Sequence, residues 1–322
     1  MSKIIGFVRN NGVAVVLLGT FCLFSAAAPS FFSIHNVLDI LHVVSPLIIV
    51  ASGMALVVIS GKLDISVGSI AYAASAVFTL TMRNYGLSFE AAVMVSLAVG
   101  TALGAINAFI VVGLRINSLI ATLGTMIAFR GLGLSMTDGG LIGMPDEVKP
   151  LGNASIGPMY IDTLIALTIL LVVHLVHRWT AFGRQLTAVG NSEDVARRIG
   201  LPIERQTVVL LLISGTLAAI AGVMYTMQVA VNTSKIGEGM EFSAVAAVVV
   251  GGISLFGGRG NILSAVIMGS LIFQIIRSGL QQVGANPYSY RLVEGVVIFV
   301  AMYADALKVG PGAIRGRLSK KT

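Results

Sequence analysis

Three polar segments interrupt the long apolar runs of this sequence, and they hold most of the side chains whose types and spacing could do chemistry. Residues 61–69 read GKLDISVGS, residues 179–205 read TAFGRQLTAVGNSEDVARRIGLPIERQ, and residues 251–260 read GGISLFGGRG. Each segment combines charged residues with glycine. This combination favours helix breaks and docking surfaces over nucleophilic or acid–base catalysis.

The first segment carries Asp64, with Lys62 two positions away as a candidate partner. A carboxylate inside a membrane domain is costly and usually lines an interior or a water-filled path. Gly61 and Gly68 bracket Asp64, so we expect the chain to unwind locally between two helical pieces, with Ser66 in the break. A short loop with one ordinary charge is the alternative.

The second segment predicts a short helix that begins at Glu193 and carries Arg197 and Arg198 in its last turn. Asn191 or Ser192 can cap this helix, Glu193 and Asp194 start it, and Gly200 with Pro202 ends it. A basic loop that only obeys the positive-inside rule would need no such signals. We therefore expect a rigid helix that docks onto a partner.

The third segment has five glycines and one arginine between apolar runs. Gly257, Gly258 and Arg259 are candidates for a break where backbones approach closely. Glycine-rich loops can also cradle phosphate. However, the Walker pattern is absent from the whole chain and the GxGxxG dinucleotide pattern is missing at this site. Binding of ATP or a dinucleotide is therefore not expected.

Polar residues elsewhere on the apolar runs could line a route for a polar solute, although interhelical hydrogen bonding is the alternative for each of them. The candidates are Asn107, Asn117 and Thr122, followed by Ser118, Thr125, Arg130, Gln228, Gln274 and Arg277. No Ser/His/Asp arrangement and no His–carboxylate cluster with metal spacing stands out. We expect no catalytic residue, metal ion or cofactor, and no enzymatic activity.

The elements that must position these residues follow from composition. The chain has 322 residues, is 56% hydrophobic and only 11% charged, and contains one cysteine; its mean hydropathy is +0.93. Soluble proteins carry about 25% charged residues, so a water-soluble monomer is excluded. The high apolar content excludes a disordered chain, and the single cysteine excludes a disulfide framework. We expect an all-α, polytopic integral membrane protein that forms one transmembrane domain over 1–322.

Apolar stretches long enough for spans predict about ten transmembrane helices, within a range of eight to eleven. They lie near 12–28, 43–60, 68–82, 91–112, 118–136, 161–178, 206–229, 242–256, 262–280 and 291–307. The third and eighth are short, as expected of helices broken around a pathway. Because many spans follow, the first is expected to remain as a helix and not to be removed as a signal peptide.

The basic residues orient these spans. With the N-terminus in the cytoplasm, fifteen of the 21 Lys and Arg residues fall on the cytoplasmic side, four fall outside and two lie within spans. The loop 179–205 and the tail 308–322 account for much of this bias, so both termini are expected to be cytoplasmic. The net charge of +7 therefore reflects membrane topology, and no nucleic-acid partner is expected.

Four motifs resemble the ribose-type (monosaccharide) ABC transporter permease family. They are ISGKLDISVGS, NSLIATLGTM, FGRQLTAVGNSEDVARRIGL and VVVGGISLFGGRGNILSAVIMGSLI, and the similarity extends from about residue 36 to 305. The family pattern around the acidic residue usually reads GGIDLSVGS. Here Lys62 replaces a glycine and the order changes to LDIS, while Asp64, Ser66 and Gly68 remain.

This resemblance implies a permease subunit in the bacterial inner membrane that imports a monosaccharide or a related polar solute. Its implied partners are ATP-binding cassette subunits, a periplasmic sugar-binding protein, and a second permease copy or a close paralogue in the lipid bilayer. The residues matching the family's coupling helix are Gly190, Glu193, Ala196, Arg197, Arg198 and Gly200. An ion- or proton-coupled secondary transporter is the alternative, and neither the solute nor a homodimer or heterodimer follows from the sequence.

Overall fold

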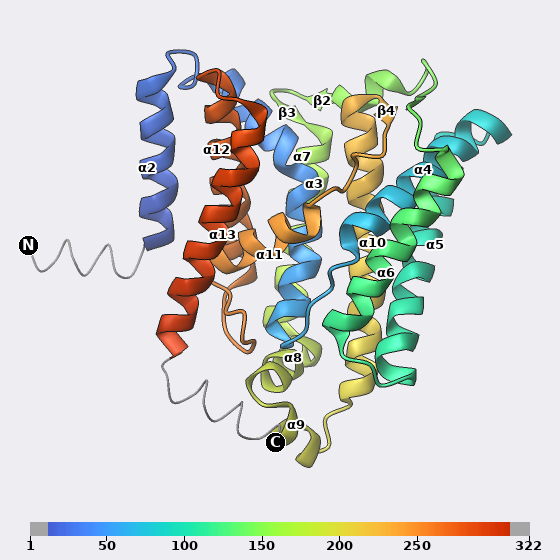
Figure 1. Ribbon diagram of the computed structural model, residues 1–322, viewed down its shortest axis with the longest axis vertical. Helices are drawn as coiled ribbons and strands as arrows, with labels where there is room; N and C mark the ends of the chain where they lie inside the picture. Colours follow the sequence, from blue (N-terminus) through green and yellow to red (C-terminus); the bar gives the residue numbers. More distant parts are fainter. Residues whose placement is uncertain (1–11, 310–322) are drawn as a thin grey trace, which may run out of the picture.

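Helix α3 (Ile34–Ile59) runs through the middle of the structure, a computed structural model that describes residues 12–309 (Figure 1). It packs against α7, α10, α11 and α12. The helices are α2 (Gly12–Ala27), α3, α4 (Val67–Tyr85), α5 (Phe89–Ala108), the π-helical η1 (Phe109–Gly113), α6 (Ser118–Thr137), the 3₁₀ helix η2 (Lys149–Asn153), α7 (Ile161–Trp179), α8 (Ala181–Asn191), α9 (Glu193–Arg198), α10 (Ile203–Val229), α11 (Met240–Val250), α12 (Ile262–Gln282) and α13 (Pro287–Val309).

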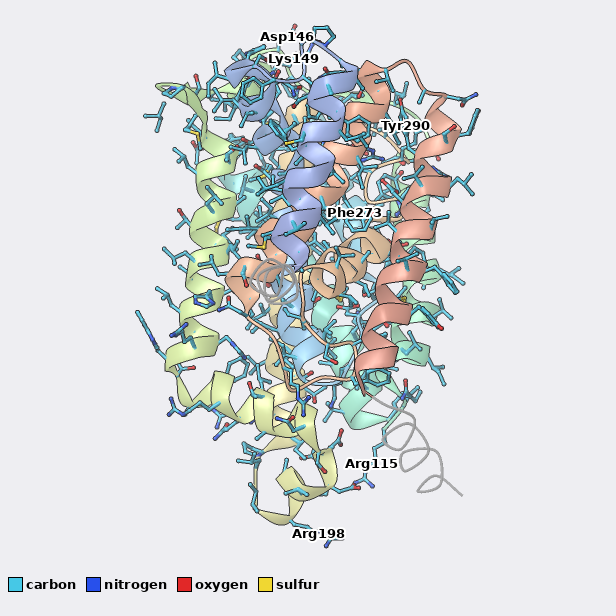
Figure 2. All side chains as sticks on the ribbon, turned by 90° about the vertical axis from the view of Figure 1, so that its left-hand side faces the viewer. Arg115, Asp146, Lys149, Arg198, Phe273 and Tyr290 are labelled. Atoms are coloured by element: carbon cyan, nitrogen blue, oxygen red, sulfur yellow. The ribbon has the colours of Figure 1, made fainter. Side chains whose placement is uncertain are left out.

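The bundle has two distinct ends. Helices α8 and α9 lie at one end, which we call the α8–α9 end (Figure 1). The other, which we call the strand end, carries two short antiparallel pairs, β1 (Ile142–Gly143) with β4 (Val231–Asn232) and β2 (Ser155–Ile156) with β3 (Met159–Tyr160). Asp146 and Lys149 lie at the strand end, whereas Arg115 and Arg198 lie at the opposite end (Figure 2).

Side-chain caps explain where several helices begin. Ser33 accepts a hydrogen bond from the amide of Asn36 and starts α3, and Ser88 accepts from Ala91 and starts α5. Asn261 accepts from Ser264 and starts α12. A cap satisfies backbone N–H groups that have no partner inside the helix.

Small residues let the central helices approach closely. A Cβ atom at Gly215 of α10 would overlap the carbonyl oxygen of Gly100 on α5, and one at Gly104 would overlap that of Leu211. Such contacts hold membrane helices together, because lipid supplies no hydrophobic driving force between them. The main core surrounds α3, where Ile49, Ala51 and Met54 are fully buried.

Helices occupy all ten positions at which the sequence predicted spans. Among residues 12–309, six helices are long and apolar enough to cross a bilayer: α3, α5 with η1, α6, α7, α10 and α12. Two helices were predicted to be short, and the structure confirms one of them. Helix α4 has 19 residues and is not short. The expected span 242–256 is an 11-residue helix, α11, because the chain turns at Gly252, whose φ of 108° excludes continued helix.

Part of the predicted topology lies outside the described residues. Of the basic tail 308–322, residues 310–322 lie beyond them, and so do the N-terminal residues 1–11. The single domain over 1–322 stays a prediction.

Candidate functional site

Asp64 lies at the centre of a buried hydrogen-bond network between α3 and α4. Its side chain is fully buried. One carboxylate oxygen accepts from the Ser66 hydroxyl at 2.6 Å and from the Ser66 amide at 3.0 Å, and the other accepts from Ser214 of α10 at 2.6 Å. Buried carboxylates require such partners. Asp64 therefore joins the break after α3 to α10.

The network continues through two further helices. Asn107 of α5 donates to the Ser66 hydroxyl at 2.7 Å and accepts from Thr125 of α6 at 2.6 Å. The hydroxyl of Thr122 accepts from the Ile65 amide at 3.1 Å. The predicted unwinding is present, since residues 61–66 are not helical. Ser214 was missed, and no local signal could have found it, because it lies 150 positions from Asp64.

The predicted cap of α9 is confirmed for Ser192, whose hydroxyl accepts from the Val195 amide at 3.4 Å. Arg197 pairs with Glu204 at 2.7 Å and with Glu193 at 3.3 Å. The hydrogen bond to Glu204 raises the pKa of Arg197 above its ordinary value. Arg198 points away from the body of the protein (Figure 2) and is exposed, which leaves it available to a partner.

An apolar contact fixes α9 against its neighbours. Ala196 is 1% exposed and packs with Val189 of α8 and Ile203 of α10. Helix α8 itself was missed by the sequence analysis. Its signals were Thr180, which accepts from the Gly183 amide at 3.3 Å, and the helical spacing of Phe182, Leu186 and Val189.

Backbones from three separate segments meet at the α8–α9 end of the bundle. The Gly258 amide donates to the carbonyl oxygen of Ile59 at 2.8 Å. A Cβ atom at Gly190 would overlap the same oxygen, and one at Gly257 would lie 3.0 Å from the Cα of Gly61. The end of α3, the end of α8 and the 251–260 loop therefore form one close-packed junction, which we call the glycine junction.

Lys62 links this junction to α9. Its ammonium lies 3.3 Å from a carboxylate oxygen of Glu193. The candidate pairing of Lys62 with Asp64 was wrong, because Asp64 is enclosed by hydroxyl donors and Lys62 reaches Glu193 at the start of α9.

A polar cavity of about 670 Å³ opens among α3, α10, α11, α12 and α13. Tyr225, Phe242 and Phe273 contribute aromatic rings, and Gln274 and Arg277 contribute polar groups. Phe273 marks the middle height of the bundle (Figure 2). Cavities with aromatic walls and a few polar groups are typical of small-molecule sites.

Two glutamates and one ion pair add charge to the cavity. Glu241, 6% exposed, has a carboxylate oxygen with no hydrogen-bond partner among the described residues. Glu294 also lines the cavity, and Arg291 pairs with Glu238 at 3.1 Å. A Cβ atom at Gly68 would overlap both Glu241 and the carbonyl of Gly237, so the absence of a side chain at Gly68 allows this wall to form.

The remaining candidates lie elsewhere. Asn117 is exposed and caps α6 by accepting from the Leu119 amide at 3.0 Å. Arg259 is exposed in the 251–260 loop, and Gly200 ends α9 with a φ of 79°. Asp64, Ser66, Asn107 and Thr122 lie in the buried network and do not line the cavity.

No group of three His, Cys, Asp or Glu side chains within residues 12–309 could hold a metal ion.

Comparison with known proteins gives a consistent picture. A family model described as "Branched-chain amino acid transport system / permease component" matches residues 36–302. The chain is 31% identical over 306 residues to the autoinducer 2 import system permease protein of Photorhabdus laumondii, covering 92% of this chain and 90% of that protein. It is 32% identical over 300 residues to the ribose import permease protein of Escherichia coli strain K12, covering 91% and 92%.

A third relative, a probable ABC transporter permease protein of the same strain, is 31% identical over 310 residues and covers 93% of this chain and 90% of its own. Among solved structures, PsaBC from Streptococcus pneumoniae in complex with Fab matches with a TM-score of 0.46 and 18% identity, over 88% of this chain and 95% of that chain. That likeness is too distant to carry an argument.

Proposed function

The chain belongs to the family of branched-chain amino acid transport system / permease components, and from that membership we propose that it is the permease subunit of an ATP-driven importer for a monosaccharide or a related polar solute. The observation that carries the proposal is the identity of about a third over nine-tenths of the chain to import permeases for ribose and autoinducer 2. It is not an enzyme; ATP is hydrolysed on a separate subunit.

The polar cavity is the proposed route for the solute. Its amide, guanidinium and carboxylate groups can exchange hydrogen bonds with hydroxyl groups, and its aromatic rings can pack against the apolar faces of a sugar. Import requires release as well as entry, so contacts here are weak. A periplasmic sugar-binding protein supplies the affinity.

Helix α9 is the proposed coupling helix, and the α8–α9 end is then cytoplasmic. The exposed arginines of α9 dock onto the ATP-binding cassette subunit, and the apolar contact of Ala196 anchors α9 to the bundle. Closure of the ATPase then moves α8, the glycine junction and the end of α3 together, which shifts the balance between inward-facing and outward-facing states.

The remaining topology follows from this orientation. All ten helices at the predicted span positions belong to the membrane domain, with α11 as a half-span, and both termini are cytoplasmic in the bacterial inner membrane. A second permease copy or a close paralogue completes the pair.

The experiment is uptake of a labelled monosaccharide into vesicles that contain this chain, its ATP-binding subunit and its binding protein. Uptake should require hydrolysable ATP and survive an ionophore that collapses ion gradients. An ion-coupled secondary transporter, for which Glu241 with its one unsatisfied carboxylate oxygen would be the coupling group, predicts the reverse. It also predicts that the chain purifies alone, whereas a permease retains a nucleotide-hydrolysing partner. Uptake driven by a gradient without ATP would overturn the proposal.

A further inference from the structure

A second cavity, of about 360 Å³, lies at the α8–α9 end, apart from the proposed solute route. Its walls include His174, His177 and Arg178 from the end of α7 and Arg184 and Thr187 from α8. Every titratable residue in its lining is basic. A concave site of this composition attracts an anion.

No carboxylate of the described residues pairs with the arginines of this cavity. Among residues 12–309, neither Arg178 nor Arg184 lies within ion-pair distance of an Asp or Glu. Within the described part of the chain, the Arg184 guanidinium donates to the backbone carbonyl of Trp179 alone, at 3.3 Å. Arginines that serve topology alone need no shared cavity, whereas two arginines converging on one hollow fit the oxygens of a phosphate group.

The start of α12 lies next to the cavity. Gly260 and Asn261 line the cavity directly before α12, a helix of 21 residues. The first N–H groups of a helix and its positive dipole end favour an anion at this position.

Two histidines of α7 complete the lining. His174 is only 8% exposed, and its Nδ1 atom is buried out of reach of solvent. His177 shares a hydrogen bond of 3.1 Å with Thr187, which also lines the cavity. The charged groups that an anion in this cavity would meet are therefore the two arginines.

The level of the cavity along α7 indicates the source of the anion. Leu171 and Val172 of α7 are exposed apolar residues, and Trp179, which is 68% exposed, ends the helix. Tryptophan at the end of an apolar helix marks the level of the lipid headgroups. The cavity therefore opens where the phosphates of the bilayer lie.

We propose that this cavity binds the phosphate headgroup of an anionic phospholipid. The guanidinium groups of Arg178 and Arg184 hold the phosphate oxygens, and the positive dipole end of α12 adds to the attraction. Basic recesses between helices on the cytoplasmic side suit such headgroups. A bound lipid would brace α7 and α8 against α12, next to the glycine junction.

The test measures lipid binding to the purified full-length protein by native mass spectrometry, using phosphatidylglycerol and, for comparison, phosphatidylcholine. The wild type should retain phosphatidylglycerol in preference. Arg178→Gln with Arg184→Gln should weaken that binding about tenfold or more, since each basic residue near an anionic surface adds to the attraction. The matched control, Arg115→Gln with Arg205→Gln, removes two exposed arginines at the same end outside the cavity and should bind normally.

Equal loss in both double variants would assign the effect to general surface charge and overturn the proposal. So would equal binding of the two lipids. Displacement of the lipid by millimolar inorganic phosphate alone would assign the site to a free anion. Unchanged lipid binding with loss of the ATP-binding subunit would assign the arginines to the protein partner. Either outcome would also overturn the lipid assignment.

Discussion

The ammonium of Lys62 and the carboxylate of Glu193 lie 3.3 Å apart, although 131 positions separate them in the chain. Lys62 follows α3 at the break before α4, and Glu193 opens α9. The pair therefore connects the segment that leads to buried Asp64 with the helix proposed to receive the ATPase. Glu193 also accepts from Arg197 at 3.3 Å, so one carboxylate serves both contacts.

The Lys62–Glu193 pair predicts a small, salt-sensitive coupling. Lys62 is 17% and Glu193 51% exposed at the side chain, so solvent screens most of the attraction. A double-mutant cycle with Lys62→Met and Glu193→Gln should give a coupling free energy of unfolding of about 0.5 kcal/mol. Unfolding by denaturing detergent checks this, and a coupling that persists in 1 M salt would contradict it.

Reversing the α9 arginines predicts uncoupling. Arg197→Glu with Arg198→Glu breaks the contacts to Glu193 and Glu204 and repels an acidic docking surface. ATP-dependent uptake and co-purification of the ATP-binding subunit should fall at least about tenfold. Arg83→Glu with Lys149→Glu, which reverses two charges at the strand end, should still retain that subunit. Intact uptake and ATPase stimulation in the α9 variant would remove the docking assignment.

Removing the Asp64 carboxylate predicts a loss of stability. Asp64→Ala leaves the hydroxyls of Ser66 and Ser214 without their buried acceptor, which should lower the free energy of unfolding by about 3 kcal/mol. The control is Asp146→Asn, because the Asp146 side chain is 93% exposed. This change should lower the free energy of unfolding by less than about 0.5 kcal/mol. Thermal unfolding in detergent compares the two, and equal shifts would show that the buried network contributes nothing.

The glycine junction predicts a strict requirement at Gly190. Gly190→Ala places a methyl group on the carbonyl oxygen of Ile59 and should destabilise the protein by about 2 kcal/mol. Gly124→Ala in α6, where nothing lies within 4 Å of the added carbon, should be neutral or stabilising by about 0.5 kcal/mol. The same unfolding measurement tests both, and a neutral Gly190→Ala would mean that the junction is loosely packed.

The cavity predicts where polar substitutions affect transport. Gln274→Leu and Arg277→Leu each remove groups that can hydrogen-bond a sugar, and uptake should fall about tenfold while basal ATP hydrolysis by the complex persists. Gln281→Leu is the control on the same helix, because Gln281 does not line the cavity. If all three variants transport alike, the solute takes another route.

Local sequence signals determined the class of protein and most of its elements. Apolar runs of about 20 residues place the helices, and the residues Ser192, Arg197 and Gly200 delimit α9, because span length and capping act within a few residues of one another. The sequence did not predict where α11 ends, because two local effects compete there. In 251–256, apolar side chains favour helix, but glycines adjoining them allow the turn that ends α11.

The tertiary structure alone decided the partners. Ser214 donates to Asp64 across 150 positions, and Glu193 pairs with Lys62. The Gly258 amide donates to Ile59. These contacts form only because α3, α8 and α10 pack around one core. The cavity beside Glu241 and the basic cavity beside His174 likewise arise between helices. Composition and spacing specify which segments cross the membrane, but the packing of side chains between those segments selects which polar groups meet, because each buried polar atom is stabilised by the neighbour it finds there.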